Sequence, residues 1–593
     1  MAVNIKFWHD CIQANRESVA VCTFKPLKHI STCMKPIFTR STLIGLTMLA
    51  VACSSLEQRK QTIPEPLVVT NPGSGTQPGS ATAVTPPTAT TPGTGTTTNP
   101  GTGTTTNPGT GTITTPPGTG TATNPGTGTA TTPTVPTTPP TPPTPPTPPT
   151  PPPPPPPPTN LFLYNGKIRL GINLNAGGAI TYLTEGFRGE NMVNNFDLGR
   201  QLQTSLYSGP VPYTPNGQKP VATWANLGWN PVQTGDYYNN PAQVISYNQT
   251  DSTRLYVKTI PLIWPLNNVV AECTMETWIE LKNNTAHVRA RTVINRSDKT
   301  QYEARTQEVP CMYLNGPYYQ KFSYTGSQPF ANAAVTQLTN EELTACYATE
   351  NWTALLNKAG RGVGLFVPNQ YRFATAFFGA TGVGSEYDGN TAYATAAPLI
   401  QMDHNGVYDY EYDLIVGNLS DIRQFVYAQP RPATVPDFRF GAAADKISAG
   451  RSGWTFYNTQ DTGLPIQNEL NVQWGRDDST KASFDIKSPQ VFYRAANVPT
   501  VYVQAAFTTP VTEVLFTWRK PEDIDFLPIP ERQAVLPIIG DGQMRTYRLN
   551  LAGRAGWEGA IMQLRFDPVL NTIPRTNERA QRVKIKSVTA TAP

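Results

Sequence analysis

A long tract rich in proline, threonine and glycine limits where this chain can fold. Residues 64–159 hold 30 of the chain's 59 prolines, no aromatic residue and one charge, Glu65. Such a segment buries too little apolar surface to offset the entropy lost on ordering, so it is expected to stay disordered. It ends in eight consecutive prolines, Pro151–Pro158, which favour a semi-rigid polyproline helix. The sequence therefore predicts a disordered stalk over residues 53–159, with a Pro-rich recognition ligand or a scaffold for O-glycans as alternatives to a spacer.

The residues before the stalk have the features of an export leader. Residues 41–52 form an apolar run that is too short to span a bilayer, which needs about 20 apolar residues. Lys35 and Arg40 precede this run and small residues follow it, as in a secretory signal. We expect a leader over residues 1–52, with Met34 as a possible true start.

The leader ends in Leu49-Ala50-Val51-Ala52-Cys53, which resembles the lipobox of bacterial lipoproteins. The resemblance implies that Cys53 is lipidated and becomes the mature N-terminus. Serine at the next position implies the outer membrane. The alternative is an ordinary cleaved signal in which Cys53 has no role. The expected location is the bacterial cell envelope, with the membrane as a partner through the lipid on Cys53.

The charges of the folded part are balanced. Residues 1–63 hold eight Lys/Arg and three Asp/Glu, and the stalk adds one Glu, so 38 of the chain's 46 basic and 37 of its 41 acidic residues lie in the body. Net charge therefore gives no reason to expect a nucleic-acid partner.

The cysteines and histidines of the body are few. With Cys53 assigned to the lipid, the body retains Cys273, Cys311 and Cys346, with only two histidines and no CxxC pair. Three cysteines allow at most one disulfide, and the sequence does not show which of them pair. We expect no Cys/His metal site and no cofactor.

The pattern from residue 160 onward is that of β-structure. Asn165-Gly166 between two apolar runs is a strong hairpin signal. Val270–Leu281 and Ala286–Asn295 form a longer pair, and the second run alternates apolar and polar residues. One short helix is expected, capped by Ser420.

The domain boundaries follow from breaks in this pattern. Prolines and small residues interrupt it near residue 436, and short strands at sandwich-like spacing follow. The sequence predicts an all-β protein with a first domain over 160–435, a smaller β-sandwich over 436–578 and a basic tail over 579–593.

Two groups of motifs carry a resemblance to known families. Asn191–Gln203, Gly228–Asp236 and Gln307–Pro310 resemble segments of secreted bacterial β-supersandwich proteins, the broad group that includes galactose mutarotase-like domains. Trp454–Tyr457 and Gly540–Gln543 resemble ancillary β-sandwiches of bacterial carbohydrate-active enzymes. The resemblance implies a β-supersandwich followed by a smaller, jelly-roll-like sandwich in a protein that handles sugar. The paired histidines and the glutamate that mutarotases use have no match in this sequence. The resemblance therefore implies the fold more than an activity.

Six side chains of the first domain are candidates for contacting a sugar: Asp197, Arg200, Trp229, Asp236, Glu308 and Tyr313. Carboxylates and guanidinium groups hydrogen-bond hydroxyls in a fixed geometry, and aromatic rings stack on the apolar face of a pyranose. Asp197 and Arg200 could equally pair with each other, and Trp229 could belong to a core.

Three functions remain open from the sequence. The first is a lipid-anchored surface protein that binds carbohydrate through its first β-domain. The second is a secreted polysaccharide hydrolase or lyase in which Glu308 and Asp197 act as the catalytic carboxyls. The third is a structural envelope protein without a ligand.

Overall fold

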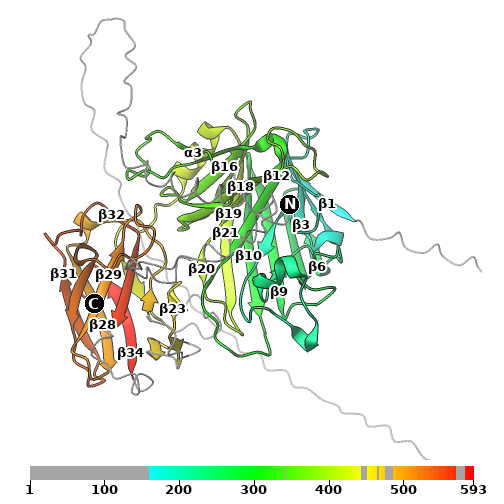
Figure 1. The fold of residues 1–593 in the computed structure, drawn as a ribbon. Helices are drawn as coiled ribbons and strands as arrows, with labels where there is room; N and C mark the ends of the chain where they lie inside the picture. Colours follow the sequence, from blue (N-terminus) through cyan, green and yellow to red (C-terminus); the bar gives the residue numbers. More distant parts are fainter. Residues whose placement is uncertain (1–158, 341, 442–449, 464–465, 474–484, 569–580) are drawn as a thin grey trace, which may run out of the picture. The chain divides into compact units, whose positions relative to one another are not determined.

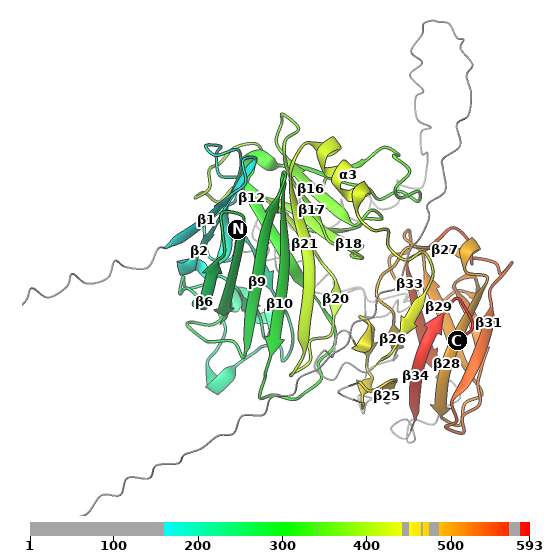
Figure 2. The ribbon, with the colours of Figure 1, turned by 180° about the vertical axis from the view of Figure 1, so that it is seen from behind.

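A computed structural model describes residues 159–593 except 341, 442–449, 464–465, 474–484 and 569–580. The described chain is built almost wholly from antiparallel strands, which confirms the predicted all-β fold (Figures 1 and 2). The leader, Cys53 and the stalk lie outside the described residues and stay predictions. No helix in the described part is long and apolar enough to cross a membrane.

The strands up to Gly417 form two large sheets. The first is ten-stranded, and its strands in sheet order are β1 (Asn160–Tyr164), β2 (Ile168–Asn173), β3 (Ala179–Glu185), β4 (Leu202–Ser205), β12 (Glu308–Asn315), β19 (Thr391–Ala396), β18 (Arg372–Phe378) and β15 (Thr344–Tyr347). In addition, β5 (Pro231–Val232) pairs with β4, and β8 (Leu262–Ile263) pairs with β5.

The second sheet is nine-stranded. Its order is β14 (Thr336–Leu338), β13 (Gln320–Ser323), β16 (Trp352–Leu356), β17 (Gly362–Phe366), β21 (Val407–Gly417), β10 (Thr285–Ile294), β9 (Cys273–Lys282), β7 (Arg254–Ile260) and β6 (Gln243–Gln249). The long strands β9, β10 and β21 run side by side, as Figures 1 and 2 show. A separate short pair joins β11 (Arg305–Thr306) to β20 (Leu399–Ile400).

The two sheets pack face to face over one apolar core. Leu170, Met312 and Phe373 from the ten-stranded sheet and Val288 and Leu414 from the nine-stranded sheet all belong to it. Because side chains alternate along a strand, the residues between these core positions project from the opposite face of the ten-stranded sheet. That outer face carries the candidate site.

Local sequence signals account for several elements. The Asn165-Gly166 turn joins β1 to β2 in the predicted hairpin, and β9 pairs with β10 across the predicted loop. The predicted helix is present as α3 (Leu419–Ala428), but its start was wrong. Asn418 is the N-cap instead of Ser420, because its side chain accepts from the Asp421 backbone while the Asp421 side chain accepts from the Asn418 backbone.

The remaining strands form a second, smaller sandwich. One sheet contains β24 (Gln460–Asp461), β25 (Leu470–Gln473), β34 (Arg582–Thr589), β28 (Thr500–Thr508) and β31 (Arg545–Asn550), with β22 (Asp437–Arg439) also beside β34. The other contains β23 (Thr455–Tyr457), β26 (Asp485–Lys487), β33 (Gln563–Pro568), β29 (Glu513–Arg519) and β30 (Gln533–Pro537), and β27 (Tyr493–Arg494) pairs with β32 (Ala560–Ile561). One apolar cluster joins both sheets.

The predicted basic tail over 579–593 is wrong. Its residues 582–589 form β34, which pairs with β22, β25 and β28. Val583 and Ile585 are buried in the core while Lys584 and Lys586 are exposed. The segment has the period of two that marks a half-buried strand, and its lysines cover the solvent face.

Candidate functional site

The outer face of the ten-stranded sheet carries a cavity of about 460 Å³, which we call the Glu308 cavity. Its floor includes Ser205, Tyr313, Phe378 and Tyr393, which come from β4, β12, β18 and β19. Each alternates with core residues on its strand, as Tyr313 does with Met312 and Leu314. The other walls come from β5, from loops and from the 3-10 helix η3 (Ala222–Leu227).

Glu308 stands where the regular pairing of β12 with β4 breaks. The register shifts between Glu308 and Cys311, so this stretch of β12 departs from simple alternation. Glu308 accepts a hydrogen bond from the hydroxyl of Tyr393 on Oε1 at 2.5 Å and one from the hydroxyl of Tyr207 on Oε2 at 2.9 Å. Both carboxylate oxygens are therefore held in a fixed orientation.

A chain of donors leads to this carboxylate. Asn230 Nδ2 donates to Ser205 Oγ at 3.2 Å, and Ser205 Oγ donates to the hydroxyl of Tyr207 at 3.1 Å. The Tyr207 hydroxyl in turn donates to Glu308. Successive hydrogen bonds of one direction polarise one another, so the chain stabilises negative charge on Glu308.

Burial raises the pKa of Glu308 above its ordinary value, and the hydroxyls of Tyr393, Tyr207 and Ser205 oppose that rise. Burial, and to a smaller extent the charge of Glu308, also raises the pKa of Tyr207, Tyr313 and Tyr393. These tyrosines are therefore protonated at neutral pH, and none is poised to act as a base.

Asp197 and Arg200 line the same cavity from the loop before β4. Their side chains form an ion pair, with Arg200 Nε at 3.5 Å from Asp197 Oδ2. Asp197 also accepts from the Gly199 backbone at 2.8 Å, and the Arg200 guanidinium lies 4.6 Å from the centre of the Phe196 ring. The pairing that the sequence left open is thus present, on a wall of the cavity and with Asp197 partly exposed.

Aromatic rings make up much of the lining. They are Phe196, Tyr207, Trp224, Tyr237, Trp264, Tyr313, Phe378 and Tyr393. Trp264 makes edge contacts with Trp224 and Tyr237, with ring centres 6.5 and 6.0 Å apart. A Cβ at Gly199 would lie 2.6 Å from the Trp264 ring, so glycine there lets the loop approach it. Apolar ring faces next to a few fixed polar groups are typical of a site for an amphipathic ligand such as a sugar.

Four of the six residues predicted from the sequence line this cavity: Asp197, Arg200, Glu308 and Tyr313. Their roles stay predictions. The other two lie elsewhere and need correction.

Trp229 does not offer a stacking face, because none of its side chain is exposed. It packs in a core cluster with Leu206, Ile263 and Met275, and Arg296 lies 5.2 Å from its ring. Asp236 is equally buried, and it accepts from the backbone of Tyr238, Asn240 and Asn268. It fixes its own loop and ties that loop to the one that holds Asn268, so it is no ligand for a sugar hydroxyl.

The sequence interpretation missed Tyr207, Tyr393, Trp224 and Trp264. One of them had a local signal, because β19 reads Thr-Ala-Tyr-Ala-Thr-Ala and Tyr393 is its one large side chain. A single aromatic among small residues on a strand leaves room above its ring. The other three lie on irregular segments or a very short 3-10 helix, where no periodicity shows which way a side chain points.

Cys273, Cys311 and Cys346 are free thiols in the structure. Over the residues that the structure describes, no group of three or more His, Cys, Asp or Glu side chains could hold a metal ion. The side chains that line the Glu308 cavity carry carboxyl, hydroxyl, amide, guanidinium and aromatic groups.

Together these features define an all-β protein with a large two-sheet sandwich that carries a carboxyl-containing aromatic cavity on one sheet. No family model and no curated protein matches the chain. Solved structures that are similar include a galactose mutarotase related enzyme from Lactobacillus acidophilus (12% identity, 43% of this chain and 97% of that chain, TM-score 0.29). A second is a galactose mutarotase-like protein from Clostridium acetobutylicum (10% identity, 44% of this chain and 95% of that chain, TM-score 0.26). A third is a GH36 alpha-galactosidase from Geobacillus stearothermophilus (10% identity, 45% of this chain and 41% of that chain, TM-score 0.28). These likenesses are weak in both sequence identity and TM-score.

Proposed function

We propose that this chain is a lipid-anchored envelope protein that binds carbohydrate in the Glu308 cavity. The observation that carries the proposal is the carboxyl of Glu308, held by the hydroxyls of Tyr207 and Tyr393 inside a cavity walled by Trp224 and Trp264. A sugar presents hydroxyls to such a carboxyl and apolar C–H faces to such rings. The volume of about 460 Å³ falls within the range of small-molecule sites.

Hydrolysis of a glycosidic bond is the second candidate, because the two carboxyls of the cavity stand in different environments. Burial raises the pKa of Glu308, which suits an acid that gives its proton to the leaving oxygen as the C–O bond breaks. Asp197, paired with Arg200, would take a proton from water or attack the anomeric carbon. Lyase chemistry with a tyrosine base gains no support, because burial raises the pKa of the cavity tyrosines.

A polysaccharide panel distinguishes these functions. The full chain is incubated with immobilised neutral and acidic polysaccharides, and both retention and released sugars are measured. Glu308→Gln is the test variant, and Glu280→Gln, on β9 and paired with Lys282, is the control.

Binding alone predicts retention without released sugar, weakened by Glu308→Gln and unchanged by Glu280→Gln. Hydrolysis predicts released sugar that Glu308→Gln abolishes while retention persists. Neither retention nor release would refute both and favour a structural envelope protein.

The anchor is tested separately. If Cys53 carries lipid, the intact mass of the mature chain fits an acylated N-terminal cysteine, and Cys53→Ser releases the protein from the membrane fraction. An unmodified chain that starts at another residue would refute the anchor and leave the Glu308 cavity unaffected.

A further inference from the structure

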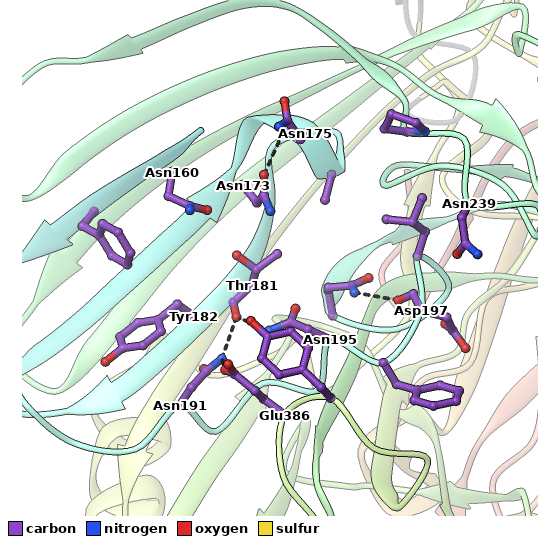
Figure 3. Close-up of a pocket in the computed structure, with 17 residues that line it drawn as sticks. Asn160, Asn173, Asn175, Thr181, Tyr182, Asn191, Asn195, Asp197, Asn239 and Glu386 are labelled. Carbon is purple, nitrogen blue, oxygen red and sulfur yellow. Dashed lines mark hydrogen bonds between the residues drawn. The ribbon is translucent and has the colours of Figure 1, made fainter. Parts of the chain in front are cut away.

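A second pocket, of about 510 Å³, lies beside the Glu308 cavity and has a different lining. Its shared feature is the side-chain amide, and we call it the asparagine pocket: Asn160, Asn173, Asn175, Asn191, Asn195 and Asn239 all line it (Figure 3). Exposed aromatic rings join them, with Tyr387 68% and Phe196 51% exposed. Of the described residues that line this pocket, none is Lys or Arg.

The two pockets share part of their walls. Phe196 and Asp197 line both of them. Arg200, which lines the Glu308 cavity, donates to the backbone oxygen of Gly389 at 3.1 Å, in the same loop as Glu386 and Tyr387 of the asparagine pocket. A residue of the Glu308 cavity is therefore hydrogen-bonded to the loop that lines the asparagine pocket.

Both pockets also stand at irregularities of the same sheet. In β3, Thr181 is an extra residue between the pairs Tyr182–Gly171 and Ile180–Ile172, and its carbonyl accepts from Asn191 Nδ2 at 2.9 Å and Asn195 Nδ2 at 2.8 Å (Figure 3). The register of β12 shifts at Glu308. From β3 across β4 to β12 is two strand spacings, roughly 10 Å. The separation between β3 and β12 is therefore longer than one pyranose ring.

Two acceptors in the wall of the asparagine pocket lack partners. Asn195 Oδ1 and Gln201 Oε1 are buried and accept no hydrogen bond from any residue that the structure describes. Gln201 is only 2% exposed, and its Nε2 donates to the Asp197 backbone. Buried polar atoms nearly always have a partner, so these oxygens indicate a donor, water or a ligand hydroxyl, that the protein itself does not supply.

We infer that the asparagine pocket is a second subsite for the same ligand, so that the ligand is an oligosaccharide or polysaccharide of neutral sugars. This inference rests on the proposed function of the Glu308 cavity. Neutral amides donate to and accept from hydroxyls, and the exposed rings supply stacking faces. The Asp197 carboxylate is paired with Arg200, but Glu386 adds a carboxylate that no lysine or arginine of this lining offsets, which disfavours uronic acids and other anionic sugars.

The test is a length series. Gluco- and galacto-oligosaccharides from the monosaccharide to the hexasaccharide are titrated calorimetrically into the full chain, with oligogalacturonates as the anionic arm. Tyr387→Ala and Asn175→Ala remove exposed side chains of the asparagine pocket, and Tyr247→Ala removes an exposed tyrosine on β6 outside both pockets.

We expect affinity for neutral sugars to rise with length, and Tyr387→Ala to weaken binding of the longer ones about tenfold. Asn175→Ala should also weaken binding of the longer sugars. Neither variant should change the affinity for the shortest ligand that binds, and Tyr247→Ala should change the affinity for none. Affinity that is independent of length, insensitivity to Tyr387→Ala, or a preference for oligogalacturonates would overturn the inference while leaving the Glu308 cavity as a binding site. If no sugar of any length binds, the proposed function itself fails.

Discussion

Replacing Tyr393 by phenylalanine isolates the hydrogen bond that orients Glu308. The ring stays and only the hydroxyl that donates to Oε1 at 2.5 Å is lost. A hydrogen bond to a charged group contributes about 1.5–3 kcal/mol, and one between neutral groups about 0.5–1.5 kcal/mol. The variant should therefore lower the free energy of unfolding by the larger amount where Glu308 is ionised and by the smaller amount where it is protonated.

The sign of the pH dependence follows from the raised pKa. Because burial lifts the pKa of Glu308 above its unfolded value, its contribution to stability is greatest at acid pH and declines as pH rises through the folded value. Tyr393→Phe raises that pKa further, so the loss of stability in the variant grows toward neutral pH.

Urea unfolding at a series of pH values measures this effect. Tyr313→Phe is the control, because its hydroxyl lines the same cavity but has no hydrogen-bond partner among the described residues. We expect it to change stability by less than about 0.5 kcal/mol. A loss in Tyr393→Phe that is equal at all pH values, or no loss, would refute the orientation of Glu308 described here.

Three further predictions concern other residues. Trp264→Ala removes a ring from the Glu308 cavity and should weaken carbohydrate binding at least about tenfold in calorimetry, and an unchanged affinity would exclude Trp264 from the site. The hydrogen bond from His287 to Asp413 raises the pKa of His287, so the pair contributes stability that is fully present below about pH 6.5 and is lost as pH rises through the folded value. His287→Gln should flatten this part of the melting profile, and an identical profile would contradict the pairing. Cys346 is partly exposed, but desolvation raises its pKa to about 12, so mass spectrometry should find it slow to react with iodoacetamide at pH 8 until the protein is denatured, and rapid labelling of the native chain would contradict the raised pKa.

Local patterns were sufficient for much of the fold. The Asn165-Gly166 turn and the alternating run of β10 specify their hairpins from neighbouring residues alone. β34 was misread as a tail because its exposed lysines dominated a segment whose buried positions are only every second residue. A strand at the end of the chain is stabilised by partners far away in sequence, which local composition does not show.

Only part of the candidate site could be predicted from the sequence, for a related reason. Chemistry-bearing residues at loops and strand ends pointed to Glu308, Asp197 and Arg200, and the structure gathers these around one cavity. The same reasoning chose Trp229 and Asp236, which are fully buried. Whether a tryptophan in a loop faces a cavity, as Trp264 does, or a core depends on the tertiary packing.

A crystal of the chain soaked with a neutral oligosaccharide that it retains would test the central claim most directly. We expect electron density for a sugar in the Glu308 cavity, with a hydroxyl at hydrogen-bond distance from Glu308 and a ring face against Trp224 or Trp264. A sugar bound only on the second sandwich, or an empty Glu308 cavity at saturating ligand, would contradict it.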